Sequence, residues 1–146
     1  IFDKLISGEW KCWKVWEDEK FMAWLTPYAN TPGVTVVAPK TNPGDYVFTI
    51  DDDTYHEFLD ATRKVVRLLE KAFDTSRVAM VIEGTGVAHV HAKLYPLHGK
   101  LADETGVWSD HTEFHPEYMG YITTAEGPKM SEEDLDEIQK KITSQL

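Results

Sequence analysis

The chain has 146 residues and a mass of 16.7 kDa, a size that suits one domain with a hydrophobic core of its own. Apolar residues make up 42% of it and charged residues 27%, which excludes a disordered, collagenous or coiled-coil chain. The formal net charge is −10, and residues 101–146 carry most of it. A binder of the DNA or RNA backbone needs a basic face, so we expect no nucleic-acid partner of that kind.

Hydropathy and cysteine content narrow the class of protein further. No apolar run approaches the roughly 18 residues of a membrane-spanning helix, so we expect no membrane partner. The single cysteine, Cys12, excludes an intramolecular disulfide and leaves too few thiolates for a zinc cluster. The first residues show no export signal. These features predict a cytoplasmic protein.

The first half of the chain reads as short strands separated by turns. In chain order, the pattern predicts a short helical turn over residues 1–7, an antiparallel hairpin of strands 10–16 and 20–25, a buried strand over 34–38 and a short extended piece over 46–50. Proline, glycine and asparagine occupy the segments between these elements, as turns require.

The next element is a long amphipathic helix over residues 51–73, where apolar side chains recur every three or four positions. Three aspartates at 51–53 supply its N-cap and a favourable charge at the positive end of its dipole. Strands are predicted over 77–83 and 88–95, with a glycine turn at 84–86 between them. The fold class is therefore α+β, with a mostly antiparallel sheet of about five strands and one long helix against it.

The sequence divides into a domain over residues 1–100 and an acidic C-terminal extension over residues 101–146. The extension is irregular at first and then predicts a second helix, capped by Ser131, with Leu135, Ile138 and Ile142 on its apolar face. We expect the extension to pack on the same domain or to be swapped across it.

The segment that carries chemistry contains His89, His91 and Lys93. Side chains alternate between the two faces of a strand, so these three point to one face and the apolar residues between them to the other. Two imidazoles and an ammonium are expensive to bury without partners, so we expect them to line a polar cleft. The preceding glycine turn can let backbone N–H groups converge on an anion.

Two other interpretations of this spacing stay open. The histidines can belong to the polar face of a half-exposed strand without a function. They can also ligate zinc, because imidazole suits that ion. A zinc site here lacks a third and a fourth ligand, and the charge of Lys93 repels the ion.

Residues 89–96 resemble the histidine triad (HIT) motif, His-φ-His-φ-His-φ-φ with φ apolar, with Lys93 where the third histidine normally stands. The similarity extends in the expected order over residues 1–99. It includes the opening segment 1–9, the hairpin segments 15–18 and 21–25, the Pro-Gly-containing segment 30–40 and the helix 51–73.

The resemblance implies a HIT-like α+β fold that binds nucleotides and usually forms a homodimer. Family enzymes hydrolyse nucleoside phosphoramidates or dinucleoside polyphosphates, or transfer nucleotidyl groups. The resemblance makes His91 the nucleophile that attacks the α-phosphorus, with His89 as its orienting partner and Lys93 as the third catalytic position. The positions that match the family's substrate-binding residues are Phe2, Leu5, Trp24, Leu25, Thr26, Pro27, Gly84, Thr85 and Gly86. Phe2, Leu5 and Trp24 fit a place in the hydrophobic core equally well.

Three departures from the family pattern bear on function. Thr26 stands where an acidic residue usually binds both ribose hydroxyls. Gly86 stands where many members carry a hydroxyl side chain that contacts the phosphate. That contact is lost unless Thr85 supplies it. Lys93, a cation at neutral pH, suits charge neutralisation on phosphate better than protonation of a leaving group.

The sequence predicts a nucleotide hydrolase or nucleotidyl transferase with a covalent nucleotidyl-histidine intermediate. No resident metal or cofactor is expected, although Mg²⁺ can arrive with a polyphosphate substrate. One alternative is a non-catalytic nucleotide-binding protein, and a weaker one is a protein that binds metal through His89 and His91.

Overall fold

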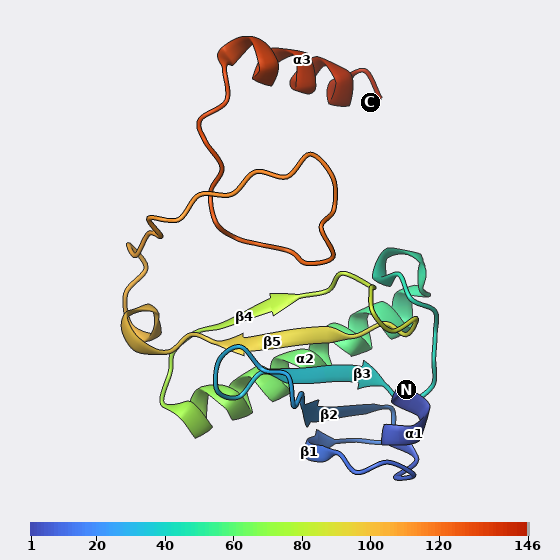
Figure 1. Cartoon of the computed structure of the whole chain (residues 1–146). Coiled ribbons are helices and arrows are strands. Elements are labelled where there is room, and N and C mark those ends of the chain that lie inside the picture. The colour runs from blue at the N-terminus through green and yellow to red at the C-terminus, as the bar shows by residue number, and fades with distance from the viewer. Residues whose placement is uncertain (146) are drawn as a thin grey trace. The chain divides into compact units, whose positions relative to one another are not determined.

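A computed structural model describes residues 1–145, and these form two compact units, Ile1–Thr105 and a second that begins at Gly106. The first unit holds a five-stranded antiparallel sheet with the strand order β1-β2-β3-β5-β4 (Figure 1). Its helices and strands are α1 (Phe2–Ile6), β1 (Trp13–Glu17), β2 (Phe21–Leu25), β3 (Thr35–Pro39), α2 (Asp52–Phe73), β4 (Val78–Val81) and β5 (Ala92–Pro96), with the 3₁₀ helices η1 (Val47–Thr49) and η2 (Gly99–Ala102). The predicted α+β fold class is confirmed.

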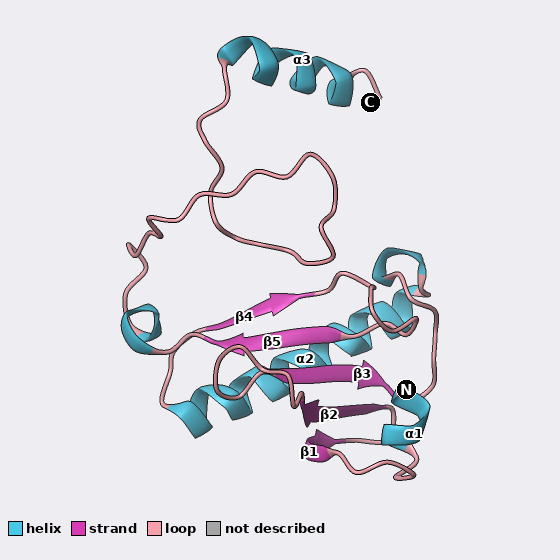
Figure 2. Cartoon of the chain, viewed as in Figure 1, coloured by secondary structure: helices cyan, strands magenta, loops and turns pink. Residues whose placement is uncertain are grey.

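The long helix α2 packs across one face of the sheet (Figure 2). Its fully buried Phe58 lies against Phe21 of β2, with 6.1 Å between the ring centroids. Strand residues whose side chains point to the same face as Phe21, among them Val37 and Leu94, complete this core. The residues that alternate with them along each strand therefore point to the opposite face of the sheet.

That opposite face carries a second apolar cluster, formed by Phe2, Met22, Trp24, Val36 and Ala38. Phe2 belongs to α1. Its aromatic ring meets the ring of Trp24 edge-on, with 5.0 Å between the ring centroids. The N-terminal helix is thus fixed against the face of the sheet that α2 leaves uncovered.

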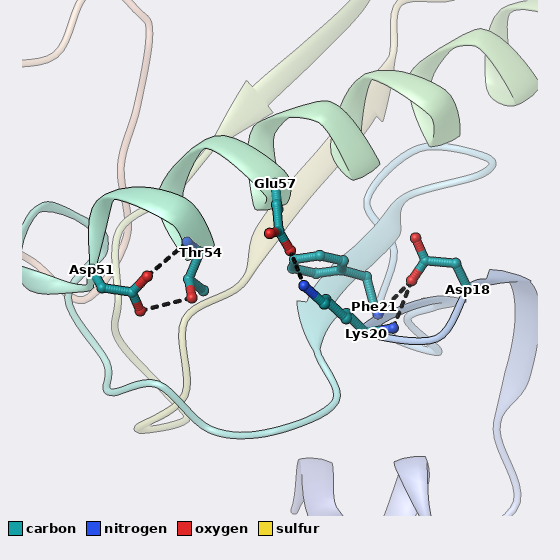
Figure 3. A network of polar contacts seen from close by, with 6 residues as sticks. All are labelled: Asp18, Lys20, Phe21, Asp51, Thr54 and Glu57. Carbon is teal, nitrogen blue, oxygen red and sulfur yellow. Dashed lines mark hydrogen bonds and ion pairs between the residues drawn. The ribbon is translucent and has the colours of Figure 1, made fainter.

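The start of α2 is fixed by polar contacts (Figure 3). The Asp51 carboxylate accepts hydrogen bonds from the backbone N–H of Thr54 at 2.9 Å and from its hydroxyl at 2.7 Å, as the predicted N-cap requires. Nearby, Lys20 pairs with Glu57 at 2.7 Å, and Asp18 accepts the two backbone N–H groups that lead into β2. The Lys20–Glu57 pair ties the hairpin to the helix.

The extended piece predicted over residues 46–50 is wrong. The segment forms the 3₁₀ helix η1, in which the carbonyl oxygen of Tyr46 accepts the backbone N–H of Thr49 at 3.1 Å and its hydroxyl at 3.0 Å. A local hydrogen bond of this kind competes with strand pairing, and no neighbouring strand is available here within the described sheet.

The strand predicted over residues 88–95 begins later, at Ala92. Pro39 ends β3, the neighbouring strand, and has no N–H group with which to continue the ladder. The backbone before β5 bonds to a loop instead: Val90 donates to the carbonyl oxygen of Gly44 at 2.7 Å, and the Asn42 amide donates to that of Ala88 at 2.9 Å.

The second unit contains the predicted C-terminal helix, α3 (Glu132–Thr143), capped by the Ser131 hydroxyl, which accepts the backbone N–H of Asp134 at 3.1 Å. No residue of this helix is buried. Ahead of it, the Glu113 carboxylate contacts His111 at 2.7 Å. Among residues 1–145, no helix is both long and apolar enough to cross a membrane.

Candidate active site

His89 and His91 lie in the irregular segment before β5 and are both buried, with 2% and 4% of their surfaces exposed. The expectation that these two imidazoles line a polar cleft is therefore wrong. Their rings lie 5.4 and 5.1 Å from the ring of Phe2, on the face of the sheet opposite α2. Val90, between them, belongs to the core under α2, so the predicted alternation of faces holds.

A backbone carbonyl satisfies one nitrogen of each buried ring. His89 Nε2 lies 2.7 Å from the carbonyl oxygen of Pro39, and His91 Nδ1 lies 2.8 Å from that of His89. A carbonyl oxygen only accepts, so the nitrogen facing it carries the proton. The neutral His91 ring therefore holds its lone pair on Nε2.

Burial lowers the pKa of His91 below its ordinary value, and the nearby Lys93 ammonium lowers it further. The hydrogen bond to the His89 carbonyl and the charge of Glu83 act in the opposite direction but do not reverse the shift. Burial likewise lowers the pKa of His89. Both imidazoles are therefore neutral at neutral pH, the form in which Nε2 of His91 is a nucleophile.

Lys93, at the third motif position, forms an ion pair with Glu83, with 2.5 Å between Nζ and Oε1. The lysine side chain is one-third exposed, whereas that of the glutamate is only 10% exposed. Glu83 follows the end of β4, and Lys93 pairs across the sheet with Val81, two residues before Glu83. The period of two therefore puts both charged side chains on one face of the sheet.

Lys93 also lines a cavity of about 300 Å³. The walls come from β3 and β5 and from the loop between β2 and β3. They are formed by Thr26, Tyr28, Asn30, Val34, Val36, Lys93 and Tyr95. Hydroxyl, amide and ammonium groups thus share one hollow with aliphatic side chains, an arrangement that can take a polar ligand with an anionic group.

The remaining predicted binding residues fall into two sets. Phe2 and Trp24 are buried, and Leu5 packs against the cluster that they form, so all three contribute to the apolar face beside the histidines. Leu25 is half-buried and Pro27 exposed, and neither lines the cavity beside Lys93. Only Thr26 joins that cavity, with its hydroxyl oxygen accepting the backbone N–H of Tyr28 at 3.2 Å.

The glycine segment before His89 has the backbone that its sequence predicts. Gly84 and Gly86 have φ angles of +74° and +83°, in the left-handed region that favours glycine. A Cβ on Gly84 would lie 2.5 Å from the carbonyl oxygen of Asp45, whereas one on Gly86 would meet nothing within 4 Å. Thr85, between them, is exposed.

Among residues 1–145, no three His, Cys, Asp or Glu side chains gather closely enough to hold a metal ion. The backbone carbonyls at His89 and His91 already take one nitrogen of each ring, which leaves the two remaining nitrogens without a third ligand among these groups. The donor set therefore does not fit a zinc site built on this pair.

Glu83 is the site residue that the sequence analysis missed. Lys93 pairs with Val81, and Glu83 lies two residues further along, beyond the end of β4. The contact therefore depends on the register of β4 against β5, which a single sequence does not provide.

Comparison with known proteins places this site in context. The sequence matches the HIT domain family over residues 7–98. It is 29% identical over 131 residues to Protein hit of Bacillus subtilis (strain 168), an alignment that covers 86% of this chain and 90% of that protein.

Solved structures agree with the sequence match. The crystal structure of a HIT family member from Bacillus subtilis superimposes with a TM-score of 0.65 at 28% identity, covering 100% of this chain and 96% of that one. The crystal structure of a HIT family hydrolase from Legionella pneumophila Philadelphia 1 shares the fold, with a TM-score of 0.55 at 19% identity over 68% of this chain and 93% of that one.

Proposed function

Because this chain belongs to the HIT domain family, we propose that it is a nucleotide hydrolase or nucleotidyl transferase that works through a covalent nucleotidyl-His91 intermediate. The observation that carries the proposal is the hydrogen bond from Nδ1 of His91 to the His89 carbonyl, which leaves the lone pair on Nε2. The hydrolase named among the structural neighbours supports the reaction class.

The substrate in this proposal is a nucleoside phosphoramidate or a dinucleoside polyphosphate. Nε2 of His91 attacks the α-phosphorus and forms an N–P bond, while the bond from phosphorus to the leaving group breaks and its electron pair departs with that group. Water, or another acceptor, then attacks the same phosphorus and gives up a proton, while the N–P bond breaks and its electron pair returns to Nε2, which restores neutral His91. The two-step route replaces one difficult displacement by two easier ones.

Lys93 acts on the charge of the phosphoryl oxygens in this proposal. Its ammonium is fixed by Glu83, and the lysine lines the same cavity as Thr26. A cation placed beside the reacting phosphorus stabilises negative charge that develops on the oxygens. A lysine is a weaker proton donor than an imidazolium, so leaving groups that need little protonation are favoured.

The test is the intact mass of the protein after brief incubation with adenosine 5′-phosphoramidate, quenched at alkaline pH because phosphoramidates are labile in acid. We expect a nucleotidyl adduct in the native protein and none in His91→Ala. His56→Ala is the matched control, because His56 is an exposed histidine on α2, and it should keep the adduct.

The absence of both an adduct and released nucleoside monophosphate would contradict catalysis on this substrate. Binding of the nucleotide without either product would instead favour the alternative, a non-catalytic nucleotide-binding protein. That alternative depends on Thr26, whose single hydroxyl stands where the family usually has a carboxylate, and on Lys93 at the third motif position.

A further inference from the structure

The ion pair between Glu83 and Lys93 places two opposite charges on the face of the sheet that also carries His91, the proposed nucleophile. The two charges shift the pKa of His91 in opposite directions, the ammonium downward and the carboxylate upward, so both act on its imidazole. The carboxylate of Glu83 is largely buried and in contact with Nζ of Lys93. With His89 and His91 neutral and the two charges of the pair opposite, these four side chains carry no net charge.

We propose that Glu83 determines the charge of the phosphate that the site accepts, selecting a singly charged, doubly substituted phosphate over a doubly charged phosphate monoester. This inference rests on the proposed function, because it concerns the phosphate that His91 attacks. The α-phosphate of a phosphoramidate or dinucleotide substrate carries one negative charge. The nucleoside monophosphate product carries nearly two at neutral pH.

Because Glu83 is largely buried, the difference in charge between substrate and product has a strong effect on how tightly each one binds. A lone Lys93 would attract the doubly charged product more strongly than the singly charged substrate, and the product would then occupy the site. Glu83 offsets that preference, because its carboxylate repels the second charge that the ammonium attracts. The Glu83 side chain is only 10% exposed, so solvent and salt screen its charge weakly.

The charge count gives a distinct expectation for each variant. Glu83→Gln makes the pair positive, Lys93→Gln makes it negative, and the double variant restores neutrality without either ion. Selectivity should therefore shift in opposite directions in the two single variants and return towards the native value in the double variant. A purely structural role for either residue does not produce this pattern, because structural losses do not cancel by charge.

The experiment measures two dissociation constants by calorimetry for each protein. The probes are adenosine 5′-monophosphate, which is doubly charged above about pH 7, and its methyl ester, which carries one charge. We expect Glu83→Gln to move the ratio of the two constants towards the monophosphate by about tenfold or more, and Lys93→Gln to move it the other way. Glu83→Asp keeps the charge and should keep the ratio, even if both affinities fall.

The control is Glu57→Gln, which removes the carboxylate of another lysine–glutamate pair, with a spacing of 2.7 Å, on the hairpin and α2. It should leave both constants unchanged. An unchanged ratio in Glu83→Gln, or a double variant that keeps the ratio of either single variant, overturns the inference while the proposed function stands. If neither probe binds the native protein or any variant, the proposed nucleotide function fails and the inference fails with it.

Discussion

Nδ1 of His91 lies 2.8 Å from the backbone carbonyl oxygen of His89, the first histidine of the same motif. The contact spans only two residues, so the local backbone itself orients the ring. It also fixes the tautomer, because the carbonyl has no proton to give. Nε2 of His91 therefore carries the lone pair, with which it can accept a proton or attack an electrophile.

The rate of adduct formation should depend on pH through His91. Its pKa is lowered, mainly by burial, so the imidazole stays neutral to a lower pH than a histidine in water. We expect the single-turnover rate to rise with pH, with an inflection below the ordinary histidine pKa of about 6.5. Rapid-quench measurements between about pH 4.5 and about pH 8 check this; an inflection above the ordinary value would contradict it.

The stability of the fold should fall in mild acid. His89 and His91 have lower pKa values in the folded protein than in the unfolded chain, where a histidine titrates near 6.5. Below that pH the unfolded chain binds protons that the folded protein excludes, so the free energy of unfolding decreases as pH falls. Urea denaturation at a series of pH values should show this slope, and His89→Gln should show less of it.

Substitution of Gly84 should cost more than substitution of Gly86. Both have positive φ, so alanine is strained at either position by about 1 kcal/mol. At Gly84 the added Cβ would also lie 2.5 Å from the Asp45 carbonyl oxygen, which forces the backbone to move. We expect Gly84→Ala to lower the free energy of unfolding by about 1–3 kcal/mol more than Gly86→Ala. Equal losses in urea denaturation would contradict the close approach.

Lys93→His should change the choice of leaving group. An imidazolium donates a proton more readily than the lysine ammonium at neutral pH. We expect turnover of an adenosine 5′-phosphoramidate with an alkylamine leaving group to rise by about tenfold or more, with little change for a para-nitrophenyl ester that needs no proton. Steady-state kinetics on both substrates decide the matter, and an unchanged rate for the amine would refute the role assigned to Lys93.

Loss of the α2 N-cap should destabilise the protein without affecting the site. Asp51→Ala removes the acceptor of both Thr54 hydrogen bonds and should lower the free energy of unfolding by about 1 kcal/mol. Asp60→Ala, at an exposed position later in the same helix, is the control and should stay within about 0.5 kcal/mol of the native protein. A loss of the same size in both variants would show that the cap contributes nothing.

The local elements of this protein follow from its sequence. The apolar period over residues 51–73 predicts α2 almost to the residue, and the Asp51 cap forms as expected. The hairpin and the C-terminal helix are likewise present. Each of these depends on side chains that lie close together in the chain, so periodicity and capping rules suffice to find them.

Only the tertiary structure decided what surrounds the motif. The sequence placed the two histidines in a cleft, but Phe2 from α1 and the carbonyl of Pro39 from β3 enclose them. It also gave no partner for Lys93, because the pairing with Glu83 depends on how β4 registers against β5. Burial and charge pairing are properties of segments distant in the chain. They exist only once the sheet has formed, and here they set the pKa and the charge of the site.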